Sequence, residues 1–196
     1  MLKFIGFYDY TVILTYMSLL SAVSGMVLAS RERFTAAVLC LVASGICDAF
    51  DGIVARSKKN RTEDEKAFGI QIDSLCDAVS FGVFPAVLCY HAGVDGFPGL
   101  VILFLYSLCA VIRLAFFNVL EGNRQKTEGG CNKTYRGLPV TSVSILLPIV
   151  WIFRRVLGVQ IFRVVLHVVL AVTAFLFVLD FSVKKPDWSK LLTRFH

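Results

Sequence analysis

Charged side chains are scarce in this 196-residue sequence, where Asp, Glu, Lys and Arg together make up 17%. Soluble domains carry about 25% of such residues, so the scarcity argues against a water-soluble protein. Hydrophobic residues make up 57% of the chain, and the mean hydropathy is +0.72. These values are typical of a protein that lies within a lipid bilayer.

The sequence also lacks a basic strip with interleaved aromatic residues, the pattern expected of a nucleic-acid-binding surface. Lys and Arg do exceed Asp and Glu, by 20 to 14, which gives a net charge of +6. These basic residues fall between apolar segments, where they would meet a membrane surface. We therefore expect the lipid bilayer as a partner and no nucleic acid.

Zinc-binding and histidine-based patterns are missing as well. The six cysteines lie mostly inside apolar segments, form no CxxC pair, and lack the Cys/His spacing of a zinc site. We interpret them as reduced and structural. The three histidines (His91, His167 and His196) are distant in sequence from the acidic residues of the apolar segments, so a histidine nucleophile is not predicted.

Long apolar segments, in contrast, are abundant. A membrane-spanning helix needs about 20 mainly apolar residues, and six segments come close to that length. This predicts an all-α polytopic membrane protein with six transmembrane helices, forming a single domain over residues 1–196. The expected spans are residues 10–30, 34–55, 69–90, 97–120, 138–153 and 156–181. An internal repeat is not visible, which disfavours an inverted-repeat transporter.

The basic residues are distributed unevenly between the two sides that six spans would create. With a cytoplasmic N-terminus, most of the 20 lie on the cytoplasmic side, which leaves Arg31, Arg33, Arg154, Arg155 and Arg163 on the other. Positive charge accumulates in the cytoplasmic loops of membrane proteins. We therefore expect both termini on the cytoplasmic side.

Four aspartates interrupt the second and third apolar segments, where each would cost about 2.5–3.5 kcal/mol at the bilayer centre. Asp48 and Asp51 share one helix stripe, and Asp73 and Asp77 share another. An antiparallel pair of helices would bring all four carboxylates together near the cytoplasmic face. Pairing with Arg56 or neighbouring lysines is the structural alternative, but intramembrane acids are functional sites by default.

Four hard oxygen donors suit one or two divalent cations such as Mg²⁺ or Mn²⁺, which would also bind a diphosphate. Gly52 and Gly69 stand beside the acids and would let phosphates and a nucleotide approach the backbone closely. A cation transporter is the alternative from another class, since the same carboxylates would suit a permeation path. The absence of acids continuing toward the opposite face argues against it.

The pattern Asp48-x₂-Asp51-Gly52-x₂-Ala55-Arg56, followed by Gly69-x₃-Asp73-x₃-Asp77, resembles the signature of the CDP-alcohol phosphatidyltransferase family. The resemblance implies a metal site and a neighbouring site for a CDP-lipid, with Asp77 as general base and a homodimeric protein. The implied ligands of Mg²⁺ or Mn²⁺ are Asp48, Asp51, Asp73 and Asp77. The implied CDP-lipid-binding residues are Gly52, Ala55, Arg56 and Gly69.

Three further stretches resemble the bacterial membrane-bound phosphatidylserine synthases of that family: residues 73–85 (DSLCDAVSFGVFP), 113–118 (RLAFFN) and 135–139 (YRGLP). The second departs from them at Phe116, where an arginine is common. The resemblance implies transfer of a phosphatidyl group from CDP-diacylglycerol to L-serine by direct displacement, in the inner (plasma) membrane of a bacterial cell. The implied serine-binding residues are Arg113, Asn118 and Arg136. Glycerol 3-phosphate or an inositol phosphate is the alternative acceptor.

Overall fold

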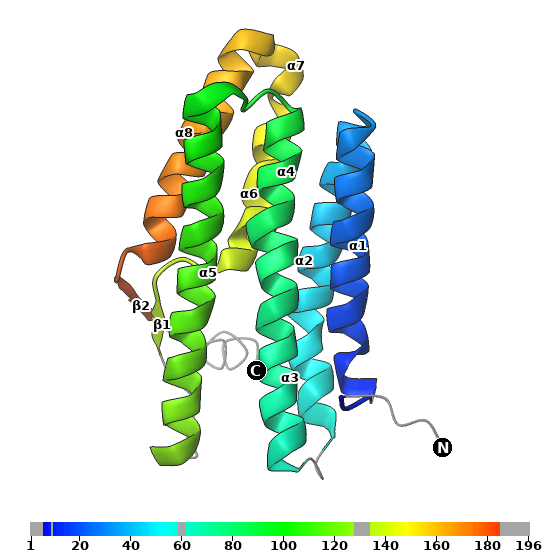
Figure 1. Cartoon of the computed structure of the whole chain (residues 1–196), viewed down its shortest axis with the longest axis vertical. Helices are drawn as coiled ribbons and strands as arrows, with labels where there is room; N and C mark the ends of the chain where they lie inside the picture. Colours follow the sequence, from blue (N-terminus) through cyan, green and yellow to red (C-terminus); the bar gives the residue numbers. More distant parts are fainter. Residues whose placement is uncertain (1–5, 9, 59–61, 128–133, 185–196) are drawn as a thin grey trace, which may run out of the picture.

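The helices of the chain lie side by side with their long axes roughly parallel (Figure 1). The computed structural model describes residues 6–8, 10–58, 62–127 and 134–184. Its α-helices are α1 (Ile13–Ser30), α2 (Phe34–Ser57), α3 (Glu63–Asp77), α4 (Phe84–His91), α5 (Gly96–Thr127), α6 (Val143–Ile152), α7 (Arg154–Leu157) and α8 (Val159–Val178). A π-helical turn, Ala78–Val83, joins α3 to α4, and 3₁₀ turns at Tyr10–Val12 and Val140–Ser142 precede α1 and α6.

In the described part of the chain, five helical segments are long and apolar enough to cross a membrane. They are Tyr10–Ser30, Phe34–Val54, Glu63–His91, Gly96–Leu120 and Val159–Val178. The segment expected as the fifth span forms a shorter apolar helix, Val140–Ile152. Thirteen residues rise about 20 Å, less than the roughly 30 Å of a hydrocarbon core. The architecture is that of a polytopic, helical membrane protein.

The third span begins earlier than the hydropathy pattern predicts, at Glu63 instead of Gly69. Thr62 supplies the reason, because its Oγ1 accepts a hydrogen bond from the Glu65 N–H at 3.2 Å. The Glu65 carboxylate accepts one from the Thr62 N–H in return, at 2.9 Å. This capping box starts the helix within the connection between the second and third expected spans.

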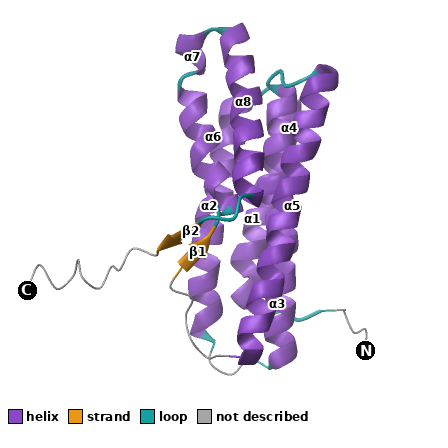
Figure 2. Cartoon of the chain, turned by 90° about the vertical axis from the view of Figure 1, so that its left-hand side faces the viewer, coloured by secondary structure: helices purple, strands orange, loops and turns teal. Residues whose placement is uncertain are grey.

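Two short strands, which the sequence did not predict, tie the end of the last span to the segment that follows α5 (Figure 2). β1 (Thr134–Arg136) pairs antiparallel with β2 (Ser182–Lys184). The Gly137 N–H donates a further hydrogen bond to the Phe181 carbonyl at 2.6 Å. The described part of the chain is therefore helical with one two-stranded ribbon, and α5 extends to Thr127, beyond the end of the predicted span.

Small residues let the helices approach each other closely. A Cβ at Gly25 of α1 would overlap the ring of the buried Phe84, and a Cβ at Gly45 of α2 would overlap Ser144 of α6. Close backbone approach at such positions is the usual packing mode of membrane helices. The outward faces of the helices carry large exposed apolar side chains, as a lipid-facing surface requires.

Candidate active site

Three of the four predicted acidic residues meet between α2 and α3. Asp48 of α2 and Asp73 and Asp77 of α3 each direct a carboxylate oxygen into one group, and these oxygens lie within 4.8 Å of one another. Asp77 is only 9% exposed. Asp73 and Asp77 are four residues apart, so they stack on one face of α3, opposite Asp48. The predicted convergence of the two acidic stripes is present for these three residues.

The chemistry of this cluster fits a cation. Among the described residues, Asp73 Oδ1 is buried and finds no hydrogen-bond partner. An unpaired buried acceptor is unfavourable, and three adjacent carboxylates add mutual repulsion. A hard divalent cation accepts several carboxylate oxygens and neutralises their charge. Asp48, Asp73 and Asp77 therefore form a donor set that suits Mg²⁺ or Mn²⁺.

Asp51 lies beside this group, on the wall of a cavity of about 120 Å³ between α1, α2 and α3. Gly52, Gly69 and Asp73 line the same cavity, together with Lys66. The Thr15 hydroxyl of α1 donates a 3.4 Å hydrogen bond to Asp51 Oδ2. The cavity thus adjoins the acidic cluster and is lined by both glycines that the sequence singled out.

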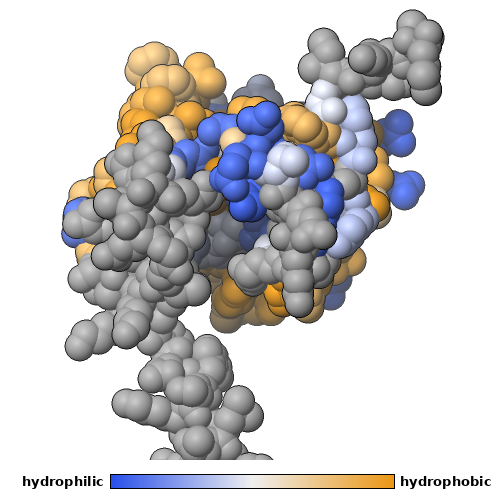
Figure 3. All heavy atoms as spheres, turned by 90° about the horizontal axis from the view of Figure 1, so that it is seen from below, coloured by the Kyte–Doolittle hydropathy of each residue, from blue (hydrophilic) through white to orange (hydrophobic). Residues whose placement is uncertain are grey.

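Two ion pairs lie at the end of the bundle where α2 ends and α3 begins. Lys58 Nζ forms an ion pair with Glu65 Oε1 at 3.2 Å, and Lys66 Nζ pairs with Glu63 Oε1 at 2.8 Å. The side chains of Ala55 and Arg56 lie outside the described part of the structure, although their backbone belongs to α2. Seen from this end of the bundle, hydrophilic residues gather at the centre of the face and hydrophobic ones at its edge (Figure 3).

The π-helical turn begins directly after Asp77 and changes the direction in which the following side chains point. Such a turn loosens the regular carbonyl ladder of a helix. Two side chains of α5 bind the carbonyls concerned: Tyr106 donates to the Phe81 carbonyl at 2.6 Å, and Ser107 donates to the Gly82 carbonyl at 3.1 Å. The helix that carries Asp77 is therefore anchored to α5 within two turns of the cluster.

Two of the residues predicted to bind serine lie on α5 near the acids. Asn118 accepts a hydrogen bond from Ser74 Oγ at 2.8 Å, and Ser74 is the neighbour of Asp73 in α3. Arg113 is 8% exposed, and its guanidinium carbon lies 5.6 Å from the centre of the Phe117 ring. The side chain of Arg136, the third predicted residue, lies outside the described part.

Sequence reasoning missed several residues that surround the site. Thr11, Thr15 and Lys66 line the cavity beside Asp51, and Asp180 lines a second cavity together with Arg113. Asp180 carried a signal in the sequence, since it is an acid directly at the end of the last apolar run. The contributions of Thr11 and Thr15 depend on the packing of α1 against α2, which no local pattern encodes.

The model of the CDP-alcohol phosphatidyltransferase family matches residues 10–181. The chain belongs to this family. The match contains α1 to α8 and all four aspartates. The resemblance seen in the acidic motif is thereby confirmed.

Curated relatives of this family member carry names that mention serine. Over 133 residues it is 38% identical to an archaetidylserine synthase of Methanothermobacter thermautotrophicus, covering 66% of the chain and 54% of the relative. CDP-diacylglycerol–serine O-phosphatidyltransferases of Saccharomyces cerevisiae and Helicobacter pylori are 37% and 34% identical, over 57% and 61% of the chain and 40% and 47% of their own lengths. The matched part thus spans about half of these relatives or less. No solved structure matches the chain.

Proposed function

We propose that this membrane protein transfers a phosphatidyl group from CDP-diacylglycerol to L-serine and releases CMP. The observation that carries the proposal is the convergence of Asp48, Asp73 and Asp77 within 4.8 Å, with an unpartnered oxygen on Asp73. This donor set suits a metal that binds a diphosphate. The names of the relatives support serine as the acceptor.

The reaction needs a deprotonated alcohol and a stabilised leaving group. The serine hydroxyl oxygen attacks the phosphorus that carries the diacylglycerol, the bond from that phosphorus to CMP breaks, and the hydroxyl proton passes to a carboxylate. We assign this base to Asp77, and the metal ligands to Asp48, Asp51, Asp73 and Asp77. A bound divalent cation would polarise the phosphoryl oxygens and balance the charge that develops on CMP.

A cavity beside the acids supports a site for the diphosphate of the substrate. Gly52 and Gly69 line the space beside Asp51 and Asp73, where a backbone without side chains permits close approach of a diphosphate. Lys66 lines the same space and would add a positive charge. We assign Gly52, Ala55, Arg56 and Gly69 to the CDP-lipid, whose acyl chains would remain in the bilayer.

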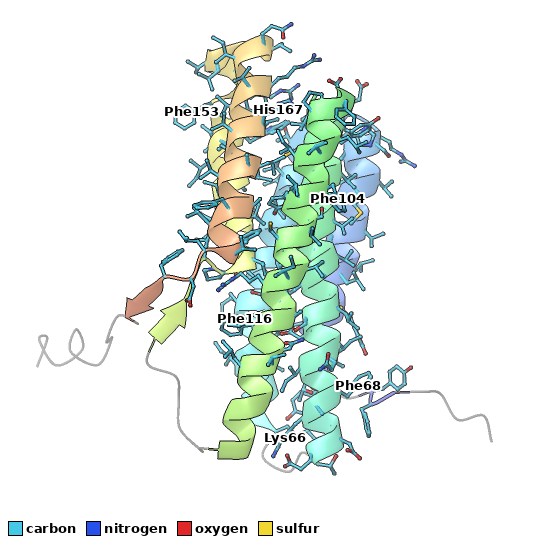
Figure 4. The ribbon with its side chains drawn as sticks, turned by 60° about the vertical axis from the view of Figure 1, so that its left-hand side comes forward. Lys66, Phe68, Phe104, Phe116, Phe153 and His167 are labelled. Carbon is cyan, nitrogen blue, oxygen red and sulfur yellow. The ribbon has the colours of Figure 1, made fainter. Side chains whose placement is uncertain are left out.

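Direct displacement is the mechanism that the positions of the histidines support. His91 ends α4, fourteen residues or about 21 Å along the helix from Asp77. His167 lies on α8 far from Lys66 and the acidic end of the bundle (Figure 4), and its Nδ1 is 2.7 Å from the Arg163 carbonyl oxygen. Neither is placed to form a covalent phosphatidyl-enzyme.

We further propose the membrane arrangement that the charge pattern favours. The short helix Val140–Ile152 would also cross the membrane, as the fifth of six spans in chain order. Both termini would then face the cytoplasm, and the acidic cluster would open to that side. The membrane would be the inner membrane of a bacterial cell, and the protein a homodimer. Labelling of single cysteines placed at Asp95 and Gly122 from either side of sealed vesicles would test the topology.

The activity is tested with purified protein in detergent, CDP-diacylglycerol and Mg²⁺ or Mn²⁺. Release of CMP is measured with L-serine, glycerol 3-phosphate and an inositol phosphate as separate acceptors. We expect release with L-serine only, and its loss when the metal is chelated. Release of CMP with a phosphorylated acceptor would support the same reaction with that acceptor in place of L-serine. No release with any acceptor, together with cation flux into protein-containing vesicles, would support the transporter alternative.

A further inference from the structure

A second cavity, of about 310 Å³, opens between α5 and the end of α8. This volume is at the lower end of the range, about 300–1,000 Å³, that small-molecule sites occupy. Two of its lining residues are charged, with opposite signs: Arg113 of α5 and Asp180, two residues after the end of α8. The other lining residues are apolar: Ile112, Phe116, Phe177, Val178 and Leu179. Figure 4 shows Phe116 on the side of α5 that faces the end of α8.

The backbone around Asp180 is fixed on both sides. The Leu179 N–H donates to the Phe175 carbonyl at 3.0 Å, which ends α8, and the Phe181 carbonyl accepts the Gly137 N–H at 2.6 Å. Arg113 is 8% exposed, and a Cβ at Gly137 would lie 2.7 Å from its Nη1. The buried Arg113 side chain is therefore held by packing, and the backbone that carries the exposed Asp180 is held by the end of α8 and the strand pair, as a preorganised site requires.

The cavity lies at the height of the acidic cluster. Hydrogen bonds from Ser107 to Gly82 and from Ser74 to Asn118 fix the register of α5 against the helix that carries Asp77. Arg113 lies close to the midpoint between Ser107 and Asn118. Because the two helices run in opposite directions, Arg113 is level with a residue close to the midpoint between Gly82 and Ser74. Asp77 occupies that position.

We infer that this cavity binds the acceptor amino acid as a zwitterion, with its carboxylate on Arg113 and its ammonium on Asp180. A free L-α-amino acid carries these two charges on one carbon, and the two opposite charges of a cavity whose other described lining residues are apolar match them. The hydroxymethyl group would then extend toward Asp77. This inference rests on the proposed transfer to L-serine, and it makes Asp180 a specificity-determining residue.

The two charged residues predict which acceptors the cavity would bind. Ethanolamine lacks the carboxylate that Arg113 binds, and 3-hydroxypropanoate lacks the ammonium that Asp180 binds. Glycerol 3-phosphate would bring a dianion against Asp180. A site that places a charge of opposite sign against each charged group of the substrate disfavours analogues in which one of those groups is missing.

The test compares acceptor analogues in Asp180→Asn and Arg113→Gln, with Asp95→Asn as the matched control, since Asp95 is an exposed aspartate between α4 and α5. In Asp180→Asn we expect kcat/KM for L-serine to fall roughly 10- to 100-fold, the size of a charged hydrogen bond, with 3-hydroxypropanoate unaffected. In Arg113→Gln the same fall is expected for L-serine but not for ethanolamine. The KM for CDP-diacylglycerol stays unchanged in both variants.

If Arg113 and Asp180 had only a structural role, each substitution would lower the rates for L-serine and its analogues by the same factor, and that result would overturn the inference. Binding is measured separately from turnover, as the rise in melting temperature that L-serine produces in Asp77→Asn. Loss of that rise on adding Asp180→Asn supports the site even if wild-type protein prefers another acceptor. Absence of any L-serine binding, with CMP release to a different acceptor, would refute both this inference and the proposed substrate.

Discussion

Replacing Gly137 with alanine perturbs the proposed acceptor site without replacing a charged residue. Gly137 has φ +65° and follows β1, where its N–H binds the Phe181 carbonyl. A Cβ there would lie 2.7 Å from Arg113 Nη1 and 2.9 Å from the Leu179 carbonyl oxygen. The guanidinium can move away, whereas the Leu179 carbonyl belongs to backbone that the strand pair holds.

Two effects add in Gly137→Ala. A left-handed backbone costs an alanine about 1–2 kcal/mol, and overpacking against fixed atoms costs about 1–3 kcal/mol. We therefore expect a loss of about 2–5 kcal/mol in the free energy of unfolding. Because Arg113 must move, the KM for L-serine should rise at least 10-fold while the KM for CDP-diacylglycerol changes little.

Thermal unfolding in detergent and CMP release at varied L-serine concentration measure the two effects. Gly122→Ala is the matched control, since it adds the same methyl group to a helical glycine with nothing within 4 Å of the new atom. It should leave both KM values unchanged and raise stability slightly, because alanine favours a helix over glycine. A Gly137→Ala variant with wild-type KM for L-serine would refute the placement of the acceptor beside Arg113.

Three further substitutions test other parts of the site. Asp73→Asn should raise the Mg²⁺ or Mn²⁺ concentration needed for half-maximal CMP release at least 10-fold, because it weakens the donor set; an unchanged metal titration would contradict the assignment. Gly25→Ala should lower the melting temperature, by an amount equivalent to about 1–3 kcal/mol, since its Cβ would overlap Phe84; wild-type stability would argue against this packing of α1. Tyr106→Phe removes the donor to the Phe81 carbonyl. We therefore expect the free energy of unfolding to fall by about 1–3 kcal/mol and kcat to fall, with little change in the KM for L-serine. The same loss of stability with a wild-type kcat would mean that the π-helical turn does not position Asp77.

The acidic cluster was predictable because it depends on local periodicity. Residues three and four apart share a helix face, so Asp73 and Asp77 had to point the same way, and a short connection had to bring them opposite Asp48. Hydropathy likewise located the long spans to within a few residues. The start of α3 was misplaced because the capping box of Thr62 and Glu65 outweighs the polar character of that segment.

The cavity between α5 and α8 was not predictable in the same way. Arg113 and Asp180 lie 67 positions apart in the sequence, and the ribbon of β1 and β2 that fixes the second of them consists of three residues in each strand. Strands this short leave no alternating pattern to read. The π-helical turn was also invisible, since it depends on Tyr106 and Ser107 in another helix.

The most direct test of the central claim is whether purified protein attaches labelled L-serine to lipid. With CDP-diacylglycerol and Mg²⁺ or Mn²⁺, we expect label in the lipid fraction in one-to-one proportion with the CMP released, and loss of both in Asp77→Asn. CMP released without incorporation of serine, or undiminished incorporation by Asp77→Asn, would contradict the account.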